Sequence, residues 1–385
     1  MRKSFMGYAR PDGSYGVRNY VAIISTADNS NFIARRVAEM IRGTVPICPC
    51  FGRGEIGADM ELHIQTMGGM GANPNVHSAV IVSLEPAIAE KIAGIIRAAG
   101  KKALVFSMDE CGGSIGCTEQ AVRAAKRLII EASLEQRVEV GIEHLQLGVE
   151  CGGSDTTSGV VSNPVVGRVA DAIVDEGGTV ILSETTEWMG AERNLCGRAA
   201  NPEVGEKIVK AIQWYEDYIK SIGVDLNGFN PAPDNIKGGL STIEEKALGS
   251  IKKGGTRPIQ DMLTCAQKPE KKGLHLMDAP TGGVENTTAL AGAGCQLILF
   301  STGKGNPLGN PIVPTIKVTG NNRTIQKSGE NIDVDLSEVI VGSMSLEEAG
   351  EILYERMIDH ANGKLTTAEA LGDLEIAVTR IGFTV

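Results

Sequence analysis

SAVIVSLEPAIAEKIAGIIRAAGKKALVFSMDE, residues 78–110, decides the fold class of this 385-residue chain. Residues 78–85 form an apolar run that predicts a buried strand. Residues 86–100 then repeat apolar side chains at helical spacing, behind a proline that suits the first turn of a helix. Residues 102–110 predict a second strand. A strand, a helix and another strand in this order are typical of a parallel sheet covered by helices.

The same alternation continues on both sides of this stretch. Toward the N-terminus, residues 19–26 predict a buried strand and residues 31–43 a helix that ends at a glycine. Toward the C-terminus, a glycine-rich loop leads into a helix that we expect over residues 118–132, with Thr118 as its N-cap. This pattern predicts that strands and helices alternate through the whole first part of the chain.

The sequence character changes at residues 132–145, which we interpret as a junction between domains. We expect further strands and helices after it, and a loop between two of the helices. The strands are expected at residues 179–187, 273–280, 295–303 and 314–320, the helices at 166–178, 201–223 and 345–363, the last closing the chain, and the loop at 227–235. We therefore predict an α/β protein with two Rossmann-like domains, at residues 1–136 and 137–385, with mainly parallel sheets flanked by helices.

The composition excludes several classes of protein. The formal net charge of −10 argues against binding to a nucleic acid backbone. No apolar run of about 18 residues occurs, so we expect no membrane span, and the polar N-terminus has no signal-peptide core. Eight cysteines in 385 residues do not suggest a secreted disulfide scaffold. We expect a cytoplasmic protein that binds neither nucleic acid nor membrane.

Three glycine-rich polar loops each follow an apolar strand. They are SMDECGGSIGC (107–117), GVECGGSDTTSG (148–159) and FSTGKGNPLGNP (300–311). Such loops let backbone N–H groups approach an anion, although none matches a P-loop or a dinucleotide fingerprint. Turn formation alone explains any one of them. Three together favour a site for a small polar ligand.

The second of these loops is the richest in functional groups. Residues 151–159 combine the Cys151 thiol, the Asp155 carboxylate and four hydroxyls directly after a strand. This mixture suits a hydroxy-acid substrate or a divalent metal. The alternative interpretation is an Asx-type turn that caps the following helix.

Two further groups of residues are candidates. Glu184, Glu187 and Glu192 cluster near the end of a predicted strand, where they would bind a hard cation or act as a base, or simply begin a solvated helix. Arg53, next to a glycine, suits a bidentate contact with an oxyanion. His63 is either a base, a ligand or a packed core histidine. The cysteines lack the paired spacing of a zinc site and give only weak support to an iron–sulfur cluster.

Long segments of the chain resemble the altronate/galactarate dehydratase family. The resemblance is collinear, covers essentially the whole chain and rests on GYARPDGSYGVRNYVAI (7–23), ECGGSDTTSGVVSNPVVGR (150–168), LSETTEWMGAER (182–193), NPAPDNIKGGLSTIEEKALG (230–249) and LAGAGCQLILFSTGKGNPLGNPIVPTIKV (290–318). It implies a lyase that eliminates a group β to a carboxylate and depends on Fe²⁺ or another divalent metal. Many members carry a preceding small domain with metal-associated histidines.

The family motif GYARPDG starts at residue 7, so the resemblance implies that this chain is the large subunit of an oligomer, with a separate small subunit that supplies the missing domain. Sugar-acid dehydratases of the family usually carry cysteines where this chain has residues 51–54, 83–85 and 249–250. Residues 51–76 instead resemble the branch that acts on 3-sulfolactate. We expect a metal-dependent release of sulfite from (2R)-3-sulfolactate that yields pyruvate. The alternatives are a sugar-acid dehydratase that releases water and a non-catalytic binding subunit.

This resemblance also implies roles for individual residues. The candidate metal ligands are Asp155, Glu184 and Glu192. The residues expected around the substrate carboxylate are Cys151, Ser154, Thr156 and Thr157. The candidates for holding the sulfonate are Arg53 and Lys317, and those for the catalytic base are His63, Lys237 and Lys246. Lys246 fits a solvated helix face equally well.

Overall fold

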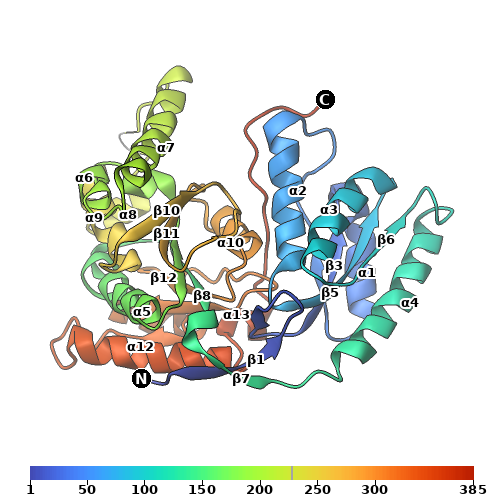
Figure 1. Ribbon diagram of the computed structural model, residues 1–385. Helices are drawn as coiled ribbons and strands as arrows, with labels where there is room; N and C mark the ends of the chain where they lie inside the picture. Colours follow the sequence, from blue (N-terminus) through green and yellow to red (C-terminus); the bar gives the residue numbers. More distant parts are fainter. Residues whose placement is uncertain (227–228) are drawn as a thin grey trace.

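The computed structural model of the chain describes residues 1–226 and 229–385. It contains a four-stranded and a seven-stranded parallel sheet, both flanked by helices, which confirms the α/β class (Figure 1). The strand order is β4-β3-β5-β6 in the first sheet and β10-β11-β9-β8-β12-β13-β14 in the second. Every strand pair within these two sheets is parallel.

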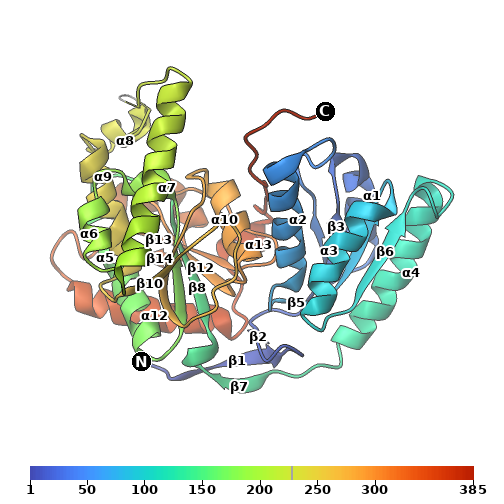
Figure 2. The same ribbon diagram turned by 45° about the horizontal axis from the view of Figure 1, so that its top comes forward.

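The N-terminal part of the chain builds the four-stranded sheet. Its elements are β3 (Tyr20–Ser25), α1 (Asn31–Met40), β4 (Thr44–Ile47), α2 (Gly57–Ala72), β5 (Val76–Ser83), α3 (Pro86–Ala98), β6 (Ala103–Ser107) and α4 (Ser114–Ala132). Helices α1 and α4 cover one face and α2 and α3 the other, as Figure 2 shows. Because both faces are covered, the strands are apolar throughout rather than alternating.

Two features of this region differ from the sequence-based expectation. Helix α4 begins at Ser114, so the prediction of Thr118 as its N-cap is wrong; the Thr118 hydroxyl donates to the Ser114 carbonyl inside the first turn at 2.7 Å. Helix α2 was not expected because its sequence is rich in glycine. A Cβ at Gly69 would lie 2.3 Å from the carbonyl oxygen of Gly292, so glycine lets α2 pack directly against another helix backbone.

The rest of the chain builds the seven-stranded sheet and its helices. The strands are β8 (Gln146–Cys151), β9 (Thr179–Leu182), β10 (Ile259–Leu263), β11 (Gly273–Met277), β12 (Leu297–Ser301), β13 (Thr315–Thr319) and β14 (Val334–Asp335). The helices are α5 (Asn163–Asp175), α6 (Glu192–Cys196), α7 (Pro202–Ser221), α8 (Pro233–Lys237), α9 (Ile243–Ser250), α10 (Gly283–Gly292), α11 (Asn322–Ser328), α12 (Leu346–Ala361) and α13 (Thr367–Leu371).

Several boundaries in this part also differ from the expectation. The strand expected at 179–187 ends at Leu182, because the chain turns into a 3₁₀ turn at Thr185–Trp188. Helix α13 follows α12, so the helix at 345–363 does not close the chain. The loop expected at 227–235 includes residues 227–228, which lie outside the described residues, and α8 begins within it.

Two segments connect the sheets. Strands β1 (Ser4–Ala9), β2 (Tyr15–Gly16) and β7 (Val138–Gly141) form an antiparallel sheet that runs below both parallel sheets (Figure 1). The C-terminal segment rises beside α2 and ends with a hydrogen bond from the Val385 N–H to the Gly54 carbonyl at 2.9 Å. The proposed domain boundary at 136/137 remains a prediction.

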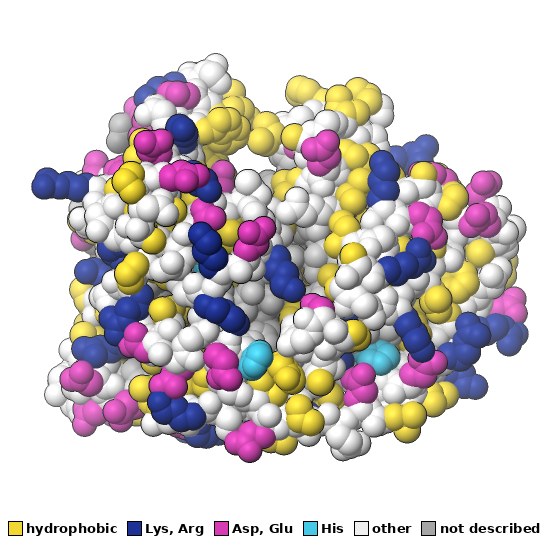
Figure 3. Space-filling model, in the orientation of Figure 1, with side chains coloured by type: hydrophobic (Ala, Val, Ile, Leu, Met, Phe, Trp, Pro, Cys, Tyr) yellow, Lys and Arg dark blue, Asp and Glu magenta, His cyan; other side chains and the backbone are white. Residues whose placement is uncertain are grey.

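The strand order of each parallel sheet reverses beside its first strand, which is β3 in one sheet and β8 in the other. Ligands of open α/β sheets bind outside the carboxyl ends of the strands at such a point. Within the described residues, no helix has both the length and the apolar character needed to cross a bilayer. On the face in Figure 3, hydrophobic side chains gather at the top, over the free end of α7 and over the C-terminal segment, on either side of a hollow.

Candidate active site

Cys151, the last residue of β8, lies in a fully buried polar cluster at the carboxyl edge of the seven-stranded sheet. Its thiol lies 3.0 Å from Glu187 Oε2 and 3.7 Å from Glu184 Oε1. Its backbone N–H donates to Glu184 Oε2 at 3.2 Å. The cluster therefore joins the end of β8 to the turn that follows β9.

Glu184 forms an ion pair with Lys253, and neither side chain has any exposed surface. The Glu184 backbone adopts the left-handed conformation, with φ of 78°, which is unfavourable for a residue with a side chain. This strained turn carries the carboxylate to the end of β8. Strain of this kind concentrates at functional sites, because the surrounding structure must hold it in place.

Glu187 is held by Lys246 and Ser250 in addition to the Cys151 thiol. Lys246 Nζ lies 2.9 Å from Glu187 Oε1, and the Ser250 hydroxyl donates to Oε2 at 2.8 Å. Both residues come from helix α9, which packs over the end of the sheet. Lys246 also donates to Asn230 Oδ1 at 2.9 Å. Lys246 is largely buried, so its interpretation as a solvated helix residue is wrong.

Burial and the neighbouring charges separate the pKa values within this cluster. Burial raises the pKa of Glu184 to about 7, with a further contribution from Glu187 and an opposing one from Lys253. Burial also favours neutral Glu187, but Lys246 and Lys253 outweigh it and hold that pKa at about 2. Burial, with the two nearby carboxylates, raises the pKa of the Cys151 thiol well above its usual range.

Cys151, Glu184 and Glu187 are a buried group that could hold a metal ion, since their ligand atoms lie within 4.8 Å of one another. The two lysines contact only one oxygen of each carboxylate, Glu184 Oε2 and Glu187 Oε1. The other oxygen of each faces the thiol. One sulfur and two oxygens therefore converge, a donor set that suits a divalent transition metal.

The loop after β8 places four of the predicted residues together. Asp155 Oδ1 accepts hydrogen bonds from the Thr157 hydroxyl at 2.7 Å and from the Ser158 N–H at 2.9 Å, and Oδ2 accepts from Asn321 Nδ2 at 2.7 Å. The Thr156 hydroxyl donates to the Gly238 carbonyl at 3.1 Å. These contacts are those of an Asx-type turn, now tied to the segments after β13 and α8.

This loop separates two pockets. A pocket of about 220 Å³ on one side is lined by Ser154, Asp155 and Thr156 together with Lys246 and Ser250 of the buried cluster. A pocket of about 650 Å³ on the other side is lined by Asp155, Thr157 and Lys237. The predicted residues 154–157, Lys237 and Lys246 thus belong to one continuous region at the carboxyl ends of β8 and β12.

Glu192 and Lys317 lie in other surroundings. Glu192 begins α6, and its carboxylate accepts from the Gly190 N–H at 2.8 Å. Lys317 lies in β13, where it is fully buried and donates to the Pro307 carbonyl at 3.0 Å, with its ammonium 5.2 Å from the centre of the Phe300 ring. Burial lowers the pKa of Lys317 to about 8.

Arg53 and His63 lie beside the four-stranded sheet, in the loop before α2 and in α2 itself. Arg53 is exposed in the loop before α2. His63 is buried in α2, with Nε2 at 2.9 Å from the Thr26 carbonyl and Nδ1 at 3.3 Å from Glu55 Oε2. Both ring nitrogens of His63 therefore face protein groups, as in a packed core histidine.

Sequence reasoning missed several members of the cluster. Glu187 was grouped with Glu184 and Glu192 as a possible cation ligand or base, but it was not among the residues chosen as metal ligands. Lys253 follows another lysine in a glycine-flanked run, which is typical of a solvent-exposed segment, so no local signal indicates its burial. Ser250 was noticed only as a place where related dehydratases usually carry a cysteine, and Asn321 carries no distinguishing pattern. The partner that allows Lys253 to be buried is Glu184, which lies 69 residues earlier in the chain.

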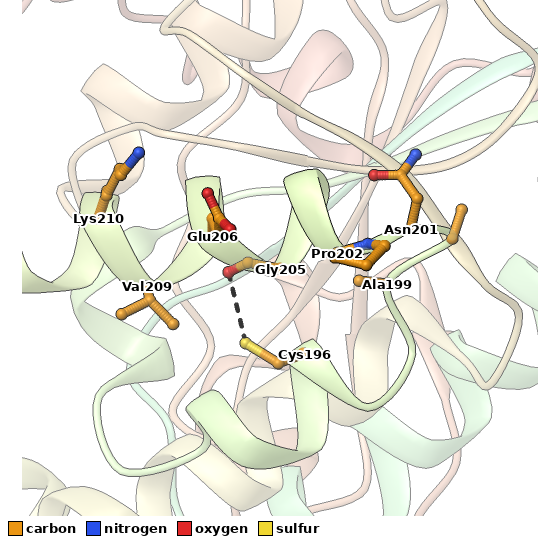
Figure 4. Close-up of a pocket in the computed structure, with 9 residues that line it drawn as sticks. Cys196, Ala199, Asn201, Pro202, Gly205, Glu206, Val209 and Lys210 are labelled. Carbon is orange, nitrogen blue, oxygen red and sulfur yellow. Dashed lines mark hydrogen bonds between the residues drawn. The ribbon is translucent and has the colours of Figure 1, made fainter.

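Another surface pocket, of about 730 Å³, lies elsewhere, between α6 and α7. Figure 4 shows its lining, in which Cys196 Sγ donates to the Gly205 carbonyl at 3.6 Å. The only charged side chains in it are Glu206 and Lys210. None of the predicted site residues lines this pocket, so we assign it no catalytic role.

Two family models match the chain. The model of the C-terminal region of D-galactarate/altronate dehydratase matches residues 142–384, and that of the second domain of D-galactarate dehydratase/altronate hydrolase matches residues 7–133. The chain is 39% identical to the (2R)-sulfolactate sulfo-lyase subunit beta of Chromohalobacter salexigens, over 98% of each chain. It is 32% identical to the altronate dehydratase of Bacillus subtilis, over 99% of this chain and 78% of that protein.

A third relative is the L-threo-forming galactarate dehydratase of Escherichia coli, which is 30% identical over 94% of this chain and 74% of its own length. All three relatives are named as lyases or dehydratases, and dehydratases are lyases that release water. The two family models together span nearly the whole sequence, and the segments that carry the expected resemblance fall within them. The chain therefore belongs to the D-galactarate/altronate dehydratase family of lyases.

Proposed function

We propose that this chain is the large subunit of a lyase that converts (2R)-3-sulfolactate to pyruvate and sulfite. The observation that carries the proposal is the end-to-end match to a sulfo-lyase subunit beta, which covers 98% of both chains. The dehydratase relatives extend beyond the match by about a quarter of their length.

The reaction requires an acidified C2–H bond and a stabilised leaving group. A base takes the C2 proton, and the electron pair of the C2–H bond becomes the C2=C3 double bond. The C3–S bond breaks, and its electron pair leaves with sulfite. The enol of pyruvate that remains gains a proton at C3 and loses its hydroxyl proton to become pyruvate. Negative charge builds on the substrate carboxylate during proton removal, so cations near it accelerate the step.

The buried cluster offers these cations. Lys246 stays protonated, because Glu187 raises its pKa despite burial, and Lys253 is held in the charged form by Glu184 and Glu187. A divalent ion, with Fe²⁺ as the proposed metal, would be held by Cys151, Glu184 and Glu187. When bound, it would supply a Lewis acid for the carboxylate and hydroxyl oxygens of the substrate. Asp155 and Glu192 remain proposed as further ligands.

We propose the remaining roles as follows. Backbone and hydroxyl groups of residues 151–157 bind the substrate carboxylate, with Ser154, Thr156 and Thr157 as donors. Lys237 is proposed to remove the C2 proton, because it lines a pocket beside this loop, whereas Glu187 holds Lys246 in the charged form and Nε2 of the buried His63 faces the Thr26 carbonyl. Neither Arg53 nor Lys317 lines a pocket beside this loop, so the proposal of these two residues as sulfonate contacts is not kept. Hydrogen exchange at C2 in deuterium oxide tests the base: the matching glutamine variant should exchange about a hundredfold more slowly. Loss of exchange in His63→Gln alone would contradict this assignment.

We also propose a small subunit partner and a cytoplasmic oligomer. The relative from Chromohalobacter salexigens is named as a subunit beta, which supports a second kind of chain. The decisive assay mixes this chain with the small subunit and Fe²⁺ and measures sulfite released from (2R)-3-sulfolactate. Sulfite release that requires both chains supports the proposal. Full activity of this chain alone would contradict the partner.

A sugar-acid dehydratase is the second candidate, because two relatives at 30–32% identity are named as such. The same assay with altronate or galactarate separates the two functions. Formation of the keto acid from either substrate, without sulfite release from sulfolactate, would overturn the sulfo-lyase assignment. If this chain is a non-catalytic subunit, the activity of the complex resides in the partner, and Asp155→Asn would leave that activity intact.

A further inference from the structure

The pocket of about 650 Å³ at the carboxyl ends of β12 and β13 is lined by positive charge. Lys237 comes from α8, Lys304 from the loop after β12, and Arg323 and Lys327 from α11. Four cations from three segments converge on one hollow, in a chain with a net charge of −10. Such local concentration against the overall charge indicates selection for an anionic ligand.

Most of these cations lack a counter-charge. Lys304 donates to the Asp234 backbone carbonyl and lies 3.3 Å from Asp234 Oδ2. Within residues 1–226 and 229–385, Lys237, Arg323 and Lys327 take part in no ion pair. Arg323 and Lys327 of α11 therefore remain available to an incoming anion, while Lys237 is the proposed base.

The wall of the pocket is held rigidly by polar contacts. Asn321 donates to the Gly303 carbonyl at 3.1 Å and accepts from the Arg323 backbone N–H at 2.9 Å. The buried Thr324 hydroxyl also donates to the Gly303 carbonyl. Asp155 is the only acid in the lining, and both of its oxygens accept hydrogen bonds from the surrounding loops. The residues behind the cations are thus pre-arranged, which lowers the entropy cost of binding.

We propose that this pocket binds an oxyanion of the sulfonate or sulfite class. The inference rests on the proposed function for the identity of the group, and it deepens that function by naming where the sulfur-bearing end of the substrate lies. Sulfonate presents three oxygens around one centre, and Arg323 and Lys327 present two unpaired cations to it. The loop at residues 154–158 separates this pocket from the one that contains Lys246. A small substrate that reaches around this loop would place its sulfur in the cationic pocket and its carboxylate near the buried cluster.

Calorimetric titration of the full chain with inorganic sulfate and with methanesulfonate, without added metal, tests the inference. We expect both to bind to the wild type. Arg323→Gln and Lys327→Gln should each weaken binding by about tenfold, the usual loss for one charge-assisted contact. Arg127→Gln is the matched control, because Arg127 lines a different cationic pocket on α4. It should leave both affinities unchanged.

Absence of binding in the wild type, or equal weakening by Arg127→Gln, would overturn the inference. Binding of sulfate but not of methanesulfonate would also overturn it, since the pocket would then admit only free inorganic anions. Thermal unfolding of each variant shows whether it is folded. If both anions bind as expected while sulfolactate yields no sulfite, the proposed function fails and the anion site stands, so the two failures are distinguishable.

Discussion

The carboxyl end of β8 and the carboxyl end of β3 occupy equivalent places in their sheets, each beside the point where the strand order reverses. At β8, two carboxylates and two lysines lie together around Cys151, and all but Lys246 are fully buried. At β3, the contacts are neutral: the Thr26 hydroxyl pairs with that of Ser83 at 2.8 Å, and Ser25 pairs with Ser30 at 2.7 Å. The one buried acid nearby is Glu55, which faces His63.

This difference shows that a reversal of strand order is not by itself enough to make a ligand site. Both sheets have a reversal of strand order, but of these two places only the one at β8 holds lysine–glutamate ion pairs. Buried ion pairs stabilise a protein weakly at best, because removing the ions from water costs several kcal/mol. A cluster that the fold does not need for stability is therefore a candidate for chemistry. We expect substitutions at the two places to have unequal effects.

The largest expected effect on stability is that of Glu184→Gln. It leaves Lys253 buried without its counter-charge, and we expect the free energy of unfolding to fall by about 3 kcal/mol. Glu55→Gln should cost about 1 kcal/mol or less, because its partner His63, unlike a lysine, can be neutral, so no charge is left buried without a partner. Urea denaturation at about pH 8.5, above the pKa of about 7 for Glu184, measures both values. Equal losses at the two positions would mean that the sheets do not differ in the way described.

The next prediction concerns Lys317, whose ammonium lies in the seven-stranded sheet. Burial lowers its pKa to about 8, against 10.5 for an ordinary lysine. Between these two values the unfolded chain holds a proton that the folded chain has released, so stability rises with pH. The unfolding free energy of the wild type relative to Lys317→Met should increase by up to about 3 kcal/mol from pH 7 to pH 10.5. A flat difference would show that Lys317 keeps its ordinary pKa.

The smallest effect is expected where the C-terminal segment meets the four-stranded sheet. Asp59 accepts hydrogen bonds from the backbone N–H groups of Ile381 and Gly382, at 3.0 and 2.6 Å. Both contacts are exposed to solvent. Asp59→Asn should therefore lower the unfolding free energy by about 0.5–1 kcal/mol. Hydrogen exchange at the two amides should accelerate, and unchanged exchange would refute the anchoring role.

The sequence predicted most of this fold. Continuous apolar strands and helical periodicity differ clearly when both faces of a sheet are covered, so β3, β5, β6, α3, α5, α7 and α12 were expected close to their observed places. Helix α2 escaped prediction because glycine is a poor helix former, and its glycines are needed for contact with α10. That requirement exists only between segments far apart in sequence.

The candidate site was only partly predictable. The loop at 151–157 stood out because a thiol, a carboxylate and hydroxyls followed a strand. The lysines were harder to interpret: Lys246 is compatible with a solvated helix, and Lys253 lies in a run of polar residues. Their burial depends on ion pairs with Glu187 and Glu184, which form only when α9 and the segment after it fold over the sheet. Single-sequence patterns carry no information on such pairing.

The most direct test of the central claim compares the turnover of two variants in the complex with the small subunit. The claim is that the chemistry takes place at β8 and not at β3. Using whichever of sulfolactate or a sugar acid the wild type converts, Glu187→Gln should lower kcat by about a hundredfold or more, because the site loses a fixed charge. His63→Gln should leave kcat within about threefold, since His63 only packs against Thr26 and Glu55. A large loss in His63→Gln together with a small one in Glu187→Gln would contradict the account.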